Sequence, residues 1–349
     1  MAVLLVIIHH WLPNYDMLPL GAWGVTFFFT LSGYLISGNL FYLKQSIDNR
    51  EISMPQAFKL FYLRRTLRIF PLYYLTILLV YLLAKPVFEG KLIWYITYLP
   101  NILMFQAKSW PGMLSPFWSL GVEEQFYLLW PLLIFLVRWD RMRYLFTFMI
   151  SVSILLKGVS WATHGSFFVT VLPWNNFDSF GAGAILAYIP FSRQKTSVLD
   201  RIPFWGGVLI SLVTSFLTYR KGIFFVFGIT VSAASFLIIR QAQKGFTGLS
   251  GKFLDNAMIR YFGRISYGLY IYHSFIPWLW RCLTGKETAY PLPIALFADH
   301  SWLNRPIVAL SAEFILLIGI ATLSWFLVEK PFINLKGFIK LKKGPTLAA

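Results

Sequence analysis

Apolar residues run along this 349-residue chain in long blocks that are separated by short polar segments. A block of roughly 20 apolar residues is long enough for one helix to cross the hydrocarbon core of a bilayer. We expect ten crossings, near residues 1–12, 22–43, 69–84, 118–137, 144–162, 171–190, 203–219, 222–239, 266–284 and 307–328. The pattern therefore predicts an all-α fold, a polytopic integral membrane bundle of about ten helices.

Two of the apolar blocks are shorter than a full crossing requires. Residues 92–105 are interrupted by Pro100, so we expect an interfacial or re-entrant piece there. The first block has about twelve residues, which rise roughly 18 Å as a helix against a hydrocarbon core of ~30 Å. Either this helix is half-length, or the chain lacks its true beginning.

Composition agrees with a membrane protein. Hydrophobic residues make up 57% of the chain and charged residues 13%, whereas a soluble domain carries about a quarter charged residues. We expect one membrane domain over residues 1–335 and a short basic cytoplasmic tail over residues 336–349. Cys282 is the sole cysteine, which excludes an intrachain disulfide and a thiolate metal cluster.

The formal net charge of +17 indicates contact with membrane lipid rather than with nucleic acid. In membrane proteins, basic residues gather in cytoplasmic loops and meet anionic lipid. With a cytoplasmic N terminus, 22 of the 31 Lys and Arg residues fall on the expected inner loops and the tail. We therefore expect both termini on the cytoplasmic side.

Glu123 and Glu124 lie inside an apolar block, in the stretch SPFWSLGVEEQFYLLWPLL. An acidic residue near the middle of a spanning helix costs roughly 2.5–3.5 kcal/mol, so both must face the bundle interior or a wet cavity. Glu123 shares a helical face with Ser119, Phe126 and Trp130. Spacing alone leaves a catalytic carboxylate and a buried structural one equally open.

The stretch AVLLVIIHHW places His9 and His10 in the first block, on different helical faces. Each is a candidate general base, although a buried histidine is usually a satisfied core residue. The two neighbours do not suit a single metal ion, and His164, His273 and His300 are scattered along the chain, so we expect no metal site.

Two further stretches carry candidate binding residues. GVTFFFTLSGYLIS places Ser32 and Gly33 in mid-block, where glycine permits a bend, a close ligand or ordinary helix packing. FYLRRTLRIFPLYYL places Arg65 and Arg68 three residues apart, suited to gripping a phosphate or to anchoring the helix at the cytoplasmic surface. Near the C terminus, FLVEKPF adds Glu329 as an expected interfacial charge.

Taken in order, six stretches resemble the type-3 acyltransferases, integral-membrane enzymes that O-acylate bacterial sugars and glycans and include the O-antigen acetylases. They are AVLLVIIHHW, GVTFFFTLSGYLIS, LRRTLRIFPLYY, WSLGVEEQFYLLWP, ISYGLYIYH and EKPF, and they extend over nearly the whole chain. The resemblance implies a multi-pass protein of the bacterial cytoplasmic (inner) membrane. It would move an acyl group, with acetyl the expected one, from cytoplasmic acyl-CoA to a hydroxyl of a sugar or cell-envelope glycan such as lipopolysaccharide or exopolysaccharide.

The resemblance also implies roles for residues. His10 falls on the histidine of the first motif and is expected to be the catalytic base, with Glu123 orienting and stabilising its imidazole. Arg65 and Arg68 would hold the phosphates of the co-substrate acyl-CoA, and Ser32 and Gly33 would line the path of its pantetheine arm; no bound cofactor is expected. The expected supporting residues are Trp118, Ser119, Glu124, Tyr127 and His273.

The chain departs from the family pattern at two places. The family usually has an arginine eleven positions before its histidine, a position that would precede Met1. Together with the short first block, this suggests a mis-set start or a truncation. The family's arginine, apolar residue and aspartate fall on Asn176, Phe177 and Asp178, so asparagine replaces the arginine.

Three alternatives stay open at the level of sequence. A covalent acyl-histidine or acyl-serine intermediate would replace direct transfer. A transporter or flippase of a glycan-type substrate would use buried acids and histidines as a relay, although the inverted repeats common in transporters are not visible. An inactive membrane scaffold is the third.

Overall fold

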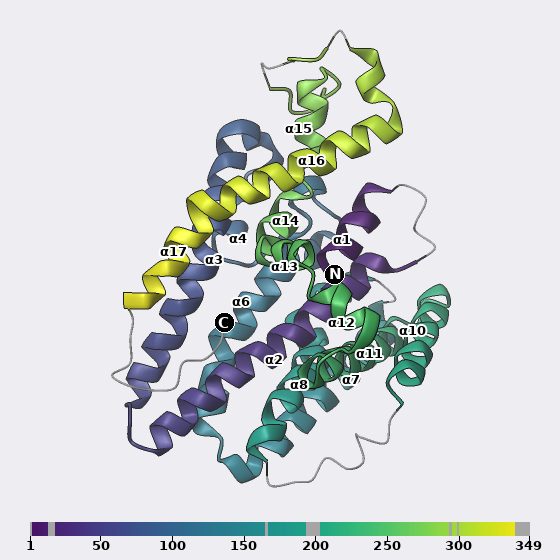
Figure 1. The fold of residues 1–349 in the computed structure, drawn as a ribbon. Helices are drawn as coiled ribbons and strands as arrows, with labels where there is room; N and C mark the ends of the chain where they lie inside the picture. Colours follow the sequence, from purple (N-terminus) through teal and green to yellow (C-terminus); the bar gives the residue numbers. More distant parts are fainter. Residues whose placement is uncertain are drawn as a thin grey trace. The chain divides into compact units, whose positions relative to one another are not determined.

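The computed structural model describes residues 2–12, 18–164, 167–192, 203–292, 295–298 and 300–338. All regular structure in these residues is helical (Figure 1). The chain divides into two compact units, which are described here separately. Unit 1 comprises Met1–Asp48 and Ile93–Gly263, and unit 2 comprises Asn49–Leu92 and Arg264–Ala349. Of the predicted basic tail, residues 339–349 lie outside the described part.

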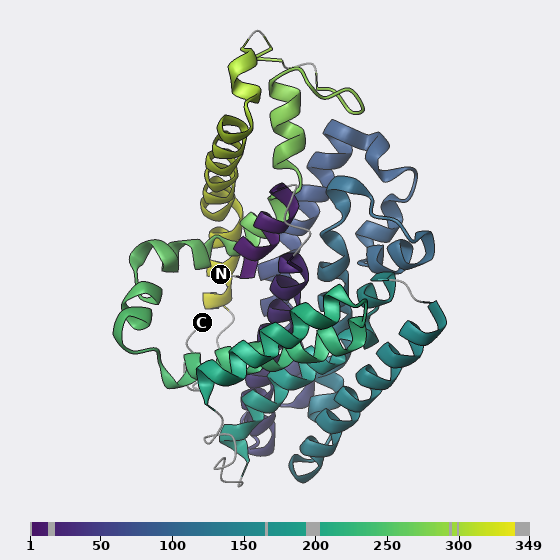
Figure 2. The same ribbon diagram turned by 90° about the vertical axis from the view of Figure 1, so that its right-hand side faces the viewer.

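Unit 1 is a bundle in which α2 is the central helix, in contact with α1, α6, α8 and α11. Helices α7, α8, α10 and α11 lie side by side in both ribbon views, in teal and green (Figures 1 and 2). The helices of unit 1 are α1 (Ala2–Trp11), α2 (Leu20–Asp48), α4 (Leu92–Ile96), α5 (Pro100–Ala107), α6 (Phe117–Leu136), α7 (Met142–His164), α8 (Phe177–Tyr188), α10 (Phe204–Arg220), α11 (Phe224–Lys244), α12 (Gly248–Leu254) and α13 (Ala257–Arg264).

The long helix of unit 2 is α3 (Met54–Ala84). Its N terminus is capped by Ser53 and Gln56, whose side chains each accept a hydrogen bond from the other residue's backbone N–H. The other elements of unit 2 are η1 (Lys85–Phe88), α14 (Ser266–Tyr272), α15 (Ile276–Leu283), η7 (Ser301–Asn304), α16 (Pro306–Ser324), the π-helical turn η8 (Trp325–Glu329), α17 (Lys330–Asn334) and η9 (Leu335–Phe338). Helices α14 and α15 pack on α16, while α17 and η9 pack on α3.

Six helical segments of the described residues are long and apolar enough to cross a membrane: Leu20–Asp48, Met54–Phe88, Gly112–Leu136, Trp139–Thr163, Phe224–Lys244 and Pro306–Gly337. The predicted all-α membrane fold is thus confirmed, but the predicted count of ten is not. Three of the other expected crossings are the shorter helices α1, α8 and α10, and the fourth is broken into α14 and α15. Residues 92–105 form the two short helices α4 and α5, in agreement with a piece that does not cross.

Glycines allow α2 to approach two of its neighbours closely. A Cβ atom on Gly33 would overlap the backbone carbonyl of Phe180 in α8, and one on Gly183 would overlap the carbonyl of Thr30 in α2. On the N-terminal half of α2, Gly21 lies against the His9 ring and Gly24 against Val6, so α1 runs antiparallel to α2. These contacts fix the position of α2 between α1 and α8.

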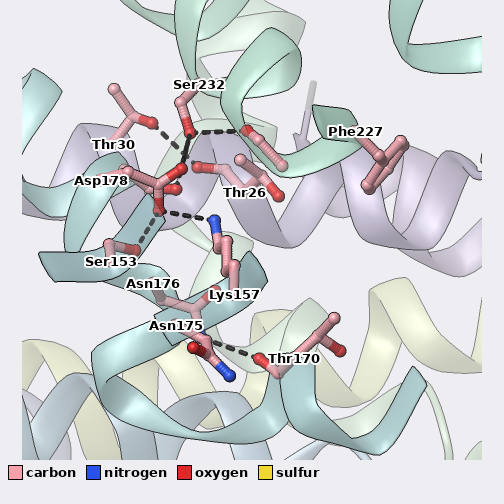
Figure 3. A network of polar contacts seen from close by, with 12 residues as sticks. Thr26, Thr30, Ser153, Lys157, Thr170, Asn175, Asn176, Asp178, Phe227 and Ser232 are labelled. Carbon is pink, nitrogen blue, oxygen red and sulfur yellow. Dashed lines mark hydrogen bonds and ion pairs between the residues drawn. The ribbon is translucent and has the colours of Figure 1, made fainter. Parts of the chain in front are cut away.

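A buried ion pair joins α7, α8 and α11 in unit 1 (Figure 3). Lys157 Nζ donates to Asp178 Oδ1 at 2.7 Å, and Ser153 Oγ donates to the same oxygen at 3.0 Å. Ser232 Oγ donates to Asp178 Oδ2 at 3.4 Å. The Lys157 and Asp178 side chains are only 8% and 3% exposed. A charge buried this deeply depends on its partner, because removal of either one leaves the other uncompensated.

The first prediction concerns this pair. Lys157→Ala is expected to destabilise unit 1 by about 3–5 kcal/mol, because the Asp178 carboxylate then stays buried without its cation. The double variant Lys157→Met, Asp178→Asn is expected to recover much of the loss. Thermal unfolding of the purified protein in detergent measures both. The control is Asp140→Asn, which breaks the exposed Arg138–Asp140 pair and should leave the melting temperature unchanged. A parental melting temperature for Lys157→Ala would contradict the prediction.

The second prediction separates two glycines of α2. Gly33→Ala is expected to lower the melting temperature, because its methyl group meets the rigid α8 backbone. Gly38→Ala is expected to maintain or raise it, because the new Cβ would lie 4.0 Å from Ala187 Cβ and alanine favours the helix. Equal melting temperatures for the two variants would show that α8 does not constrain Gly33.

Candidate active site

A chain of hydroxyl and carboxylate groups lies where α2 meets α6. Tyr127 OH donates to Ser32 Oγ at 3.1 Å, and Ser32 Oγ donates to Glu123 Oε1 at 2.5 Å. Tyr127 is buried, whereas Ser32 and Glu123 are half-buried. Ser32 therefore both accepts from Tyr127 and donates to Glu123. The hydrogen bonds thus join the two helices on the half-buried face they share.

On the face of α6 that carries Glu123, the residues that follow it toward the C terminus of the helix are aromatic, as their spacing predicts. Phe126 stacks on Phe180 with ring centroids 4.0 Å apart and on Trp130 with centroids 5.1 Å apart. Trp130 Nε1 donates to Ser37 Oγ of α2 at 2.8 Å. Phe126 and Trp130 are both buried, so they fix the rotation of α6 against α2 and α8 and hence the direction of Glu123.

The remaining α6 candidates lie in the helix's first two turns. Ser119 is buried and donates to the Pro116 carbonyl at 3.1 Å, a local bond at the start of the helix. Trp118 is half-buried, with its ring edge-on to Phe29 at 5.9 Å between centroids. Glu124 is half-buried beside Glu123. All three belong to the helix that carries Glu123, and Ser119 has a structural partner of its own.

His9 and His10 have different environments, as their helical positions predict. The His9 ring lies against Gly21 of α2, whereas His10 is exposed. His10 Nδ1 lies 2.8 Å from the Val6 carbonyl oxygen. A carbonyl only accepts hydrogen bonds, so the proton is assigned to Nδ1, and in the neutral ring Nε2 carries the lone pair. This is the tautomer that can take a proton at Nε2.

The Val6 carbonyl is a partner that the sequence analysis missed, since the orienting group for His10 was expected to be Glu123. The available signal was the position of His10 in the last turn of α1, where side-chain donors reach back to helix carbonyls. Lys157 was missed as well. It supplies a cation to Asp178 where the family pattern would place an arginine at Asn176, and Asn176 instead donates to the Thr170 and Leu172 carbonyls.

In unit 2, Arg65 and Arg68 lie on α3, just before Ile69, whose backbone carbonyl accepts a hydrogen bond from a tyrosine. Tyr267 OH, from α14, donates to the Ile69 carbonyl at 3.1 Å. Arg65 is half-buried and Arg68 is exposed. Glu329 was expected to be an interfacial charge, but it is buried with 4% exposure and lies in electrostatic range of Arg68. Its side chain lies at the end of the π turn with Oε1 against Gly268, so it is covered by protein; an interfacial position stays a prediction.

His273 is fully buried at the break between α14 and α15. Its Nδ1 lies 2.5 Å from the Tyr270 carbonyl oxygen, and its Nε2 lies 3.4 Å from Ser274 Oγ. Both ring nitrogens therefore have partners within unit 2. This is the arrangement of a satisfied core histidine that shapes the helix break.

The predicted residues divide between the units. The hydrogen bonds of unit 1 bring Ser32, Glu123 and Tyr127 together. Gly33, one residue from Ser32, faces α8 instead, in the close packing described above. Unit 1 holds His10, Ser32, Gly33, Trp118, Ser119, Glu123, Glu124 and Tyr127, and unit 2 holds Arg65, Arg68 and His273.

The amino-acid sequence of this chain is similar to those of several known proteins. The chain is similar to the peptidoglycan O-acetyltransferase OatA of Listeria monocytogenes, with 28% identity over 389 aligned positions that cover 99% of this chain and 56% of the relative. It is similar to the O-acetyltransferase OatA of Staphylococcus aureus, with 29% identity over 97% of this chain and 56% of the relative. A putative peptidoglycan O-acetyltransferase of Bacillus subtilis, YrhL, is 25% identical over 97% of this chain and 54% of its own length.

The chain thus spans about half the length of the curated relatives it matches. No solved structure shows a significant match to it. A family model described as an acyltransferase domain matches residues 1–329, which is nearly the whole chain. The chain therefore belongs to the type-3 acyltransferase family.

Proposed function

We propose that this protein is a membrane O-acyltransferase that moves an acetyl group from cytoplasmic acyl-CoA to a hydroxyl of a cell-wall glycan of the peptidoglycan class. The observation that carries the proposal is the match of almost the entire chain to relatives named for peptidoglycan O-acetylation. Their names favour peptidoglycan over the lipopolysaccharide and exopolysaccharide acceptors expected from sequence. A multi-pass position in the bacterial inner membrane gives such an enzyme access to the cytoplasmic donor.

His10 is the base of the proposed reaction. Nε2 takes the proton of the acceptor hydroxyl while its oxygen attacks the thioester carbonyl. The carbon–sulfur bond then breaks, and the imidazolium returns the proton to the departing thiolate, so the products are an acetyl ester and CoA. The bond from Nδ1 to the Val6 carbonyl keeps the base-competent tautomer in place.

Glu123 supports this step through its charge. Val6 supplies the partner of Nδ1, so the carboxylate's task is to favour the imidazolium that forms during the reaction. Ser32 Oγ donates a hydrogen bond to the carboxylate and fixes its direction, and Tyr127 OH donates to Ser32 Oγ. Arg65 and Arg68 bind the phosphates of acyl-CoA, since guanidinium groups match phosphate geometry.

The decisive experiment is incubation of membranes containing the protein with radiolabelled acetyl-CoA, followed by fractionation of the glycans. The expected product is label in muramidase-digested peptidoglycan that mild alkali removes, as an ester requires. Esterified label in another glycan would support the proposed acyl transfer and identify a different acceptor. Absence of esterified label from every glycan would contradict the enzyme and favour the transporter or scaffold alternatives.

The third prediction tests the base. His10→Ala is expected to lower the transfer rate by roughly 10²–10⁴-fold, the usual contribution of a positioned acid or base. His9→Ala, whose ring packs on Gly21, is expected to retain most of the rate. Both variants must reach the membrane in parental amounts, which immunoblotting of membranes checks. A well-inserted His10→Ala protein with near-parental transfer would overturn the assignment.

The fourth prediction tests the carboxylate chain. Glu123→Gln keeps an acceptor for Ser32 but removes the charge, so the rate is expected to fall severely. Tyr127→Phe removes one hydroxyl and is expected to have a smaller effect in the same direction. Combined with His10→Ala, Glu123→Gln is expected to add little further loss, because groups that act as a unit are not additive. Independent, multiplicative losses would separate Glu123 from the base.

A further inference from the structure

Helices α12 (Gly248–Leu254) and α13 (Ala257–Arg264) follow a helix that is long enough to cross the membrane. That helix, α11, has 21 residues, which rise about 30 Å, the thickness of the hydrocarbon core. It ends at Lys244, and the three residues that lead to α12 reach roughly 11 Å at most. With α11 across the membrane, α12 therefore begins close to the surface where α11 ends.

The apolar side chains of α12 face outward. Leu249 and Phe253 lie one turn apart on the same face of the helix and are 87% and 54% exposed. The opposite face, at Gly251, is buried, and a Cβ atom there would overlap the Phe246 carbonyl. Lys252 is exposed beside the apolar face. The packing of α12 thus turns its apolar side away from the described part of the chain.

Helix α13 is amphipathic, and none of its eight residues is buried. Met258 and Phe262, one turn apart, lie on one side of the helix, and Arg260 and Arg264 lie on the opposite side. Met258 is 66% exposed, and Arg260 is exposed as well. No helix among the described residues packs extensively on α12 or α13. The apolar sides of both helices are therefore available to a partner that removes them from water.

Charge complementarity identifies the partner. From Lys244 to Arg264 the chain has four basic residues and one acidic residue, Asp255. A helix with one apolar and one basic side lies in the boundary between lipid headgroups and acyl chains, and anionic lipid strengthens its binding. A leaflet that contains anionic phospholipid thus matches both the apolar and the basic residues, at the place where the chain leaves the membrane.

We propose that α12 and α13 form an interfacial segment that docks on the anionic phospholipid surface of the membrane. Their apolar side chains enter the boundary with the acyl chains, and Lys252 and Arg260 contact the phosphate groups of the headgroups. The residues that enter the boundary are Leu249, Phe253, Met258 and Phe262. Anionic lipid is then a specific partner of unit 1, in addition to the bilayer that surrounds its crossing helices.

The fifth prediction compares fluorophores attached at two neighbouring positions of the full chain in nanodiscs that contain phosphatidylglycerol. Met258→Cys places the label on the apolar side of α13, and Ala257→Cys places it on the basic side without removing a charge. Brominated lipid is expected to quench the label at position 258 more strongly than the label at position 257. Acrylamide, a water-soluble quencher, is expected to act in the reverse order. Cys282 is buried, and its background labelling is measured on the parental chain.

Two results would overturn the inference. Equal quenching of both labels by acrylamide, without quenching by lipid, would show that α13 is a solvated segment. Protection of the label at position 258 from both quenchers would show that protein covers the apolar side. Both labelled positions are exposed in the structure, so neither substitution removes a buried contact.

A second arm tests the anionic headgroups with the label at position 258. Phosphatidylcholine in place of phosphatidylglycerol is expected to weaken the quenching by brominated lipid. In phosphatidylglycerol, Lys252→Gln combined with Arg260→Gln is expected to lower the ratio of docked to free segment roughly fivefold per charge. The matched control, Arg220→Gln with Lys221→Gln, removes two exposed charges between α10 and α11 and should be quenched like the parent. Equal quenching in both lipids, or an equal effect of the two pairs, would overturn the assignment to anionic headgroups.

Discussion

A carboxylate inside an apolar helical bundle must find a partner in the protein, because lipid offers none and the uncompensated charge is costly. Three carboxylates of this chain meet the constraint in three ways. Asp178 is paired with Lys157 and two serine hydroxyls. Glu123 accepts a hydrogen bond from Ser32 Oγ, and Glu329 lies within electrostatic range of Arg68. The first arrangement compensates its charge fully and stabilises three helices, whereas the other two lie beside the residues that we assign to chemistry and to binding.

Helix α2 shows how packing and chemistry are divided between neighbouring residues. Gly33 lets the α8 backbone approach, and Ser32, about 100° away around the helix, faces Glu123 and Tyr127 of α6. The close crossing at Gly33 therefore sets the rotation of α2, and that rotation delivers the Ser32 hydroxyl to the carboxylate. The aromatic stack of Phe126, Phe180 and Trp130 fixes α6 in the complementary orientation. A change at Gly33 would consequently be transmitted to the proposed site although glycine offers no functional group.

The assignment of His10 depends on a backbone carbonyl rather than on an acidic side chain. In the hydrolase triads a carboxylate holds the imidazole tautomer and stabilises its charged form. Here the carbonyl of Val6, one turn earlier, accepts a hydrogen bond from Nδ1–H, so the two tasks are separable. In the mechanism that we propose, Glu123 acts through its charge alone, which is why replacement by an isosteric glutamine is informative.

The sequence by itself determined the membrane class, the all-α fold, the aromatic face below Glu123 and the difference between His9 and His10. These follow from hydropathy and from the helical repeat of 3.6 residues, which act locally along the chain. Only the tertiary structure decided that six segments have the length of a crossing, that Lys157 compensates Asp178 and that Glu329 is buried. Each of these depends on which helices become neighbours or on where a helix breaks. Contacts between residues far apart in the chain arise from packing, and no local pattern encodes them.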